Sequence, residues 1–169
     1  YIGMGSDFQF SVSPADEVSL TLSQANDFTA STTVTLSATT SYGQGFIIQT
    51  HMADSQGKLA SGTYNIIKFP YPNSSPVAWD QSCHASSTCG FGYTTSDSTL
   101  PGTPENRFTD NTFCNADPGN QCWAGFAENS ASPDPVGNMT TAGAETYAHT
   151  VKASVDYDQP AGNYTGTIY

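Results

Sequence analysis

The alternation of residues near the end of the chain restricts the fold more than any other feature. The positions that recur at every second residue there are Tyr147, His149, Val151, Ala153, Val155 and Tyr157, and then Tyr164, Gly166 and Ile168. A period of two is that of a β-strand, whose side chains point alternately to opposite faces. Between the two runs, Pro160 and Gly162 favour a reversal of the chain. We therefore expect a hairpin or an arch in a fold built from strands.

The second run stops at Tyr169 without a turn signal or a polar tail after it. A strand at the edge of a sheet leaves backbone groups without partners, and another chain can pair with them. We therefore expect a sandwich with an open edge that accepts a strand from elsewhere.

Further strands are predicted along the whole chain, which we treat as a single domain of residues 1–169. They cover residues 8–13, 17–23, 32–39, 45–53 and 64–69, with turn residues between them. This spacing of roughly ten residues is typical of an all-β, immunoglobulin-like or jelly-roll-like sandwich. Residues 70–145 are rich in Pro, Gly and Ser and hold all four cysteines, so they are predicted to form a loop-rich insertion with short strands near 77–80, 90–94 and 123–128.

The charge and the cysteines limit the partners and the location. Fifteen acidic residues and only four Lys or Arg give a formal net charge of −11. A nucleic-acid or anionic membrane surface needs clustered cations, so neither is expected as a partner. No apolar run is long enough to cross a membrane. The even cysteine count and a first residue, Tyr1, that is not an initiator methionine favour a processed, secreted chain outside the cell, at the cell surface.

The cysteines have two interpretations. Cys83–Cys89 and Cys114–Cys122 are predicted to be two local disulfides that staple the loop layer, although four cysteines allow three pairings. The alternative is a metal site that includes His84, but zinc sites usually have closer cysteine pairs. The oxygen-rich residues 110–120 would suit calcium, yet they also read as an ordinary turn. No metal and no cofactor is predicted.

Several stretches of sequence carry a resemblance to known surface proteins. They are TVTLSATTSYGQGFIIQT at residues 33–50, Trp79, GFGY at 90–93, KASV at 152–155 and QPAGNYTGTI at 159–168. In this order they resemble small secreted β-sandwich domains of bacterial surface proteins, including pilin-like subunits of self-assembling filaments. The resemblance implies an extracellular structural or adhesive module, in some members completed by a strand from a neighbouring subunit.

Catalysis is not expected. The chain lacks the nucleophile elbow of hydrolases and the zinc-binding His-Glu-x-x-His motif. Glu105, Asp110, Glu128 and Asp134 could include the two carboxylates of a glycosidase, but acidic residues in loops are usually only solvated.

Two functions therefore compete. The first is a filament subunit that binds copies of itself. Residues 1–13 are then a candidate donated strand, in which Phe8, Phe10 and Val12 enter a neighbour's core, although they could equally be the first strand of their own sandwich. The second is a monomeric adhesin or carbohydrate-binding module that stacks host or matrix glycans on Trp79, Tyr93 and Trp123. Against it, such aromatic residues commonly fill the core of a sandwich.

Overall fold

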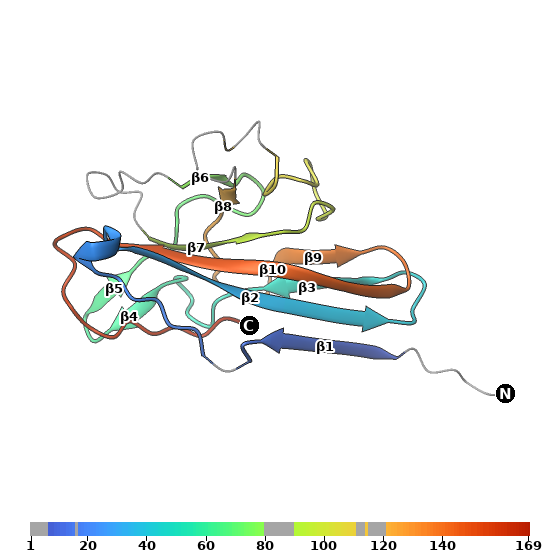
Figure 1. Ribbon diagram of the computed structural model, residues 1–169, viewed down its shortest axis with the longest axis horizontal. Coiled ribbons are helices and arrows are strands. Elements are labelled where there is room, and N and C mark those ends of the chain that lie inside the picture. Colours follow the sequence, from blue (N-terminus) through green and yellow to red (C-terminus); the bar gives the residue numbers. More distant parts are fainter. Residues whose placement is uncertain (1–6, 16, 80–89, 111–113, 115–120) are drawn as a thin grey trace.

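The computed structural model describes residues 7–15, 17–79, 90–110, 114 and 121–169, and these form an all-β sandwich (Figure 1). Its elements are β1 (Phe8–Ser13), the short 3-10 helix η1 (Gln24–Asn26), β2 (Thr29–Thr40), β3 (Phe46–Thr50), β4 (Leu59–Ser61), β5 (Tyr64–Ile66), β6 (Val77–Ala78), β7 (Gly90–Thr95), β8 (Cys122–Trp123), β9 (Asp134–Met139) and β10 (Gly143–Ser154). The predicted fold class is confirmed. No helix in the described part is long and apolar enough to span a membrane.

The first layer is a four-stranded antiparallel sheet in the order β1-β2-β10-β7. β2 and β10 pair over twelve residues, from Gly143 opposite Thr40 to Ser154 opposite Thr29. Most of their inward positions are apolar, and their outward positions carry hydroxyls that bond across the strands, such as Thr33 to Thr150 at 2.8 Å. The period of two in residues 147–150 therefore arises from one buried and one more exposed face, whereas residues 151–154 are buried on both faces because Trp79 and Trp123 of the loop layer cover Lys152 and Ser154.

The second layer is built around β3 and β9, which pair antiparallel with a bulge between Ile48 and Gln49. The chain end joins this layer, because Ile168 bridges Met52 and Thr165 bridges Ala60. Of the two predicted geometries the structure has the arch: β10 belongs to the first layer, and the following residues cross to the second (Figure 1). The core between the layers holds Leu36, Ile48, Met52, Val136, Tyr147 and Val151, among others.

The loop layer covers the outer side of β7. β6 and β8 pair there, and a disulfide joins Cys114 to Cys122, with the two Cα atoms 5.4 Å apart. One of the two predicted disulfides is therefore confirmed, whereas Cys83 and Cys89 lie outside the described residues. A second apolar cluster of Phe69, Trp79 and Trp123 fills this layer.

The prediction of a strand at residues 17–23 was wrong. These residues are extended but belong to no strand, because no described segment pairs with their backbone. Val18, Leu20 and Leu22 nevertheless pack against the core, which explains their alternation. Conversely, β9 lies within residues 70–145, where no strand was expected at 134–139.

Candidate functional site

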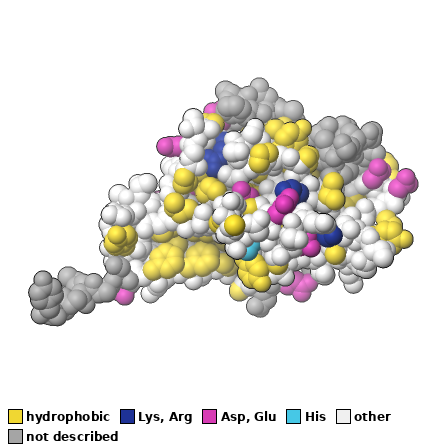
Figure 2. All heavy atoms as spheres, turned by 180° about the vertical axis from the view of Figure 1, so that it is seen from behind, with side chains coloured by type: hydrophobic (Ala, Val, Ile, Leu, Met, Phe, Trp, Pro, Cys, Tyr) yellow, Lys and Arg dark blue, Asp and Glu magenta, His cyan; other side chains and the backbone are white. Residues whose placement is uncertain are grey.

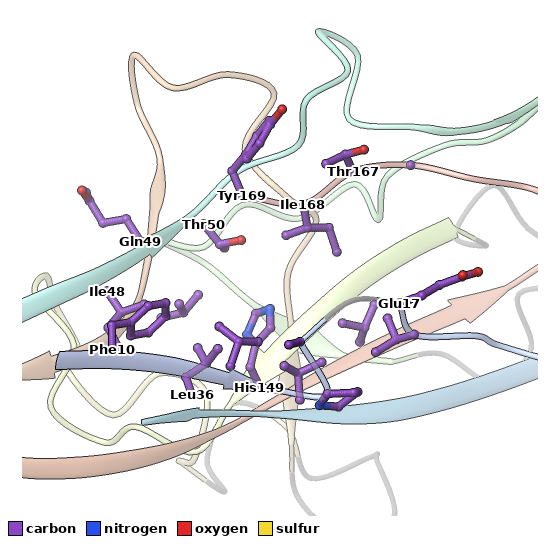
Figure 3. A pocket seen from close by; sticks show the side chains of 18 of the residues that line it. Phe10, Glu17, Leu36, Ile48, Gln49, Thr50, His149, Thr167, Ile168 and Tyr169 are labelled. Atoms are coloured by element: carbon purple, nitrogen blue, oxygen red, sulfur yellow. The ribbon is translucent and has the colours of Figure 1, made fainter. Parts of the chain in front are cut away.

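The two layers do not close along one side of the sandwich, and a groove of about 510 Å³ lies there (Figure 3). Its lining consists mainly of apolar side chains of β1, β2, β3 and β10, together with the chain end: Phe8, Phe10, Val12, Pro14, Ala15, Glu17, Val18, Val34, Leu36, Ile47, Ile48, Gln49, Thr50, Val136, His149, Val151, Gly166, Thr167, Ile168 and Tyr169. Figure 2 shows hydrophobic side chains gathered along one side of the molecule. We call the groove lined by these residues the edge groove.

One wall of the edge groove is β1. This strand pairs with the chain's own β2, from Phe8 opposite Thr40 to Ser13 opposite Thr35. The Phe8 ring reaches the facing layer at Phe46, with ring centroids 6.0 Å apart. Even so, Phe8 is 56% and Phe10 47% exposed, because β3 is the last described strand of the second layer on this side and no further strand covers them. β1 therefore extends the first sheet beyond the end of the second.

The other wall is the edge of β3. His51, directly after β3, exchanges two backbone hydrogen bonds with Tyr169, at 2.9 and 2.8 Å. Backbone groups alternate in direction along a strand, so the N–H and C=O groups of Gln49 and Ile47 point to the same side as those of His51. Within the described residues β9 is the only strand that pairs with β3, and it lies on the other side. The edge at Gln49 and Ile47 is therefore open for pairing.

His149 on β10 lies in the floor of the edge groove (Figure 3). It is 5% exposed, and neither ring nitrogen has a hydrogen-bond partner among the described residues. Its ring packs against Tyr93 and Phe126, with centroids 5.1 and 6.0 Å away. Burial lowers the pKa of His149 from 6.5 to about 4, so the ring is neutral at physiological pH.

The three aromatic residues considered for glycan stacking are buried. Trp79, Tyr93 and Trp123 are 1%, 0% and 3% exposed. Trp79 stacks on Phe69 with centroids 4.3 Å apart, and the Lys152 Nζ lies 5.0 Å from Trp79 and 4.8 Å from Trp123. Their faces are therefore in contact with other protein groups and do not form a stacking surface for sugars.

A polar network joins the loop layer to the sandwich. The buried Arg107 donates from Nε to the Asn73 carbonyl at 2.7 Å, and the Asn73 side chain donates to the Tyr93 hydroxyl, also at 2.7 Å. Burial raises the pKa of Tyr93 well above its ordinary value. The network binds elements together, and its members Asn73 and Arg107 also line a smaller cavity of about 280 Å³ with Asp134.

Three of the four acidic candidates have partners within the protein. Asp134 accepts the Ala127 N–H at 2.8 Å, and Glu128 forms an ion pair with Lys68. Burial raises the pKa of Asp134. Asp110 accepts a hydrogen bond from Asn106 at 3.3 Å. Among the described residues no group of three or more His, Cys, Asp or Glu could hold a metal ion.

The sequence interpretation found one wall of the groove and missed the other. Phe8, Phe10 and Val12 do lie at the open side, but as part of their own sheet. Ile47 was missed, although it had a signal. It follows Phe46 and precedes Ile48, so it breaks the alternation, and it is 54% exposed. The alternation put His149 on a strand but gave no sign that it would line an opening.

No protein-family model, no curated protein and no solved structure matches this chain.

Proposed function

We propose that the protein is a structural subunit of an extracellular surface filament, and that a β-strand from a neighbouring subunit completes its sandwich. The observation that carries this proposal is the edge groove, in which an apolar lining and an open strand edge occur together. An added strand gains backbone hydrogen bonds from such an edge and specificity from side-chain pockets at alternate positions.

The energetics favour an occupant. Full burial of a large apolar side chain contributes about 1.5–3 kcal/mol. Phe8, Phe10 and Ile47 are each about half exposed in the single chain, so a strand that covers them gains a substantial part of that amount for each. Natural sheets usually protect an edge with charges or proline, whereas β1 has the uncharged sequence FQFSVS.

The location rests on the cysteines. A disulfide between Cys114 and Cys122 is typical of an oxidising compartment, which supports a secreted protein. The competing function as a carbohydrate-binding module lacks a comparable observation, because its three candidate aromatic residues are in the interior.

The test uses two matched substitutions. Ile47 and Ile67 are 54% and 58% exposed, but only Ile47 lines the edge groove. Sedimentation velocity and negative-stain electron microscopy would compare the wild type, Ile47→Lys and Ile67→Lys over a range of concentrations. We expect filaments from the wild type and from Ile67→Lys, and monomers from Ile47→Lys. A wild type that stays monomeric at every concentration, or filaments that form equally well from Ile47→Lys, would contradict the proposal.

A further inference from the structure

The edge groove lacks a strand in the second layer, not in the first. β1 already occupies the edge of the first sheet, where it pairs with β2 along all six of its residues. Among the described strands, both β1 and β3 have one edge without a strand partner, but the half-exposed side chains of β1 face the position beside β3. A strand placed there would pair with Gln49 and Ile47 and cover Phe8 and Phe10.

β1 cannot serve both as the wall of this groove and as the strand that fills a neighbour's groove. If every subunit of an assembly donated β1, every groove would lose the Phe8 and Phe10 wall. The other apolar strands of the described chain are held in one of the layers. A donor from a second copy must therefore lie outside these strands.

We infer that the occupant is the segment of residues 1–6 from a second copy of the chain. This inference rests on the proposed function, because it assumes that the groove accepts a strand. The segment, YIGMGS, places Ile2 and Met4 on the same face of an extended strand. Six extended residues span about 20 Å, which is the length of the six-residue β1 that forms one wall.

Charge also favours this segment. Among the described residues that line the groove, Glu17 alone has a charged side chain. Residues 1–6 contain no charged side chain, so their insertion adds no local repulsion between two copies that each have a net charge of −11.

The starting point of the segment favours a second copy over the same chain. Asp7 is bonded to Ser41 through both its backbone groups, its N–H to the Ser41 hydroxyl at 3.0 Å and its C=O to the Ser41 N–H at 3.1 Å. The chain therefore passes Asp7 at the turn between β2 and β3, where β1 begins. To reach the groove of its own chain the segment must reverse at once and lose part of its length, whereas the groove of another copy demands no reversal.

The test keeps the full chain and changes one face of the segment at a time. The variant Ile2→Asp/Met4→Asp puts two carboxylates on the face that enters the groove. The control variant Gly3→Asp/Gly5→Asp adds the same charge to the same segment, on the opposite face. We expect the first pair to weaken self-association at least about a hundredfold, because two charges would enter an apolar groove, and the second pair to change it by less than about threefold.

A peptide of residues 1–7 then tests the groove directly. Added to the full-length Ile2→Asp/Met4→Asp variant, it should bind and shift the NMR signals of the His149 ring nitrogens. It should fail to bind when Ile47→Lys is also present. Self-association that survives Ile2→Asp/Met4→Asp unchanged, or a peptide that leaves His149 unshifted, would overturn the inference.

The outcomes separate this inference from the proposed function. Filaments that are lost in Ile47→Lys but kept in Ile2→Asp/Met4→Asp would support the filament subunit and overturn the donor. Closed dimers that need Ile2 and Met4 would support the donor and contradict the filament. Two copies that exchange their segments with each other form a closed pair, whereas copies that each donate to the next one form a filament.

Discussion

The buried His149 makes the stability of the fold depend on pH in a way that one substitution removes. In the native state burial lowers the pKa of His149 from 6.5 to about 4. The unfolded chain binds a proton near pH 6.5, while the native chain does not bind it until about pH 4. The native state therefore loses stability as the pH falls from about 6.5 to about 4. Below about pH 4 the contribution of His149 to the unfolding free energy no longer changes with pH.

The magnitude follows from the size of the change. A difference of one unit between the native and the unfolded pKa corresponds to about 1.4 kcal/mol of unfolding free energy. His149 should therefore lower the unfolding free energy by about 3 kcal/mol between pH 6.5 and pH 4. The raised pKa of Asp134 acts in the opposite sense, because a carboxyl group that is more easily protonated in the native state gains stability on acidification. Comparison with a His149 variant cancels that contribution.

The assay is urea unfolding of the wild type and of His149→Phe from pH 7.5 to pH 4. Phenylalanine keeps a ring against Tyr93 and Phe126 but cannot be protonated. We expect the difference in unfolding free energy between the two proteins to change by about 3 kcal/mol across this range. Parallel pH profiles of the two proteins would refute the reasoning, whatever their absolute stabilities.

Three further predictions concern the stability of the layers. Replacing Cys114 and Cys122 with alanine should lower the unfolding free energy by about 2–3 kcal/mol, since the disulfide closes a loop with a sequence separation of only 8; an unchanged urea midpoint would contradict this. Trp79→Ala should cost about 3–5 kcal/mol, because the side chain is 1% exposed and stacked on Phe69, and a thermal shift no larger than that of a surface substitution would disprove it. Gly45→Ala should destabilise the turn before β3, because Gly45 has a φ of +72° and an added Cβ would lie 1.8 Å from the Met139 carbonyl oxygen. The control Gly43→Ala places its Cβ in open space and should be as stable as the wild type.

The alternation of residues predicted the strands whose two faces meet different surroundings. It identified β2, β10 and β1, because each has apolar residues on one side and hydroxyl or polar residues on the other. It failed at residues 17–23, where half-buried side chains alternate without a strand partner. It also failed at β9, whose sequence DPVGNM contains a proline and a glycine, residues that normally interrupt strands.

The candidate site shows a different limit. Which residues line an opening depends on how the two sheets end relative to each other, and no local pattern encodes that. The exposure of Ile47 and the position of His149 follow from β1 extending past the edge of β3. The alternation of Phe8, Phe10 and Val12 fixed only that these side chains share a face, and it left open whether that face belongs to a donor or to an acceptor.

The most direct test of the central claim is a cryo-electron microscopy structure of the assembled protein. We predict extended density in the edge groove, beside Gln49 and Ile47 of β3 and over Phe8 and Phe10, that is continuous with a neighbouring subunit. An assembly in which every groove is empty, with the subunits joined through other surfaces, would contradict the account.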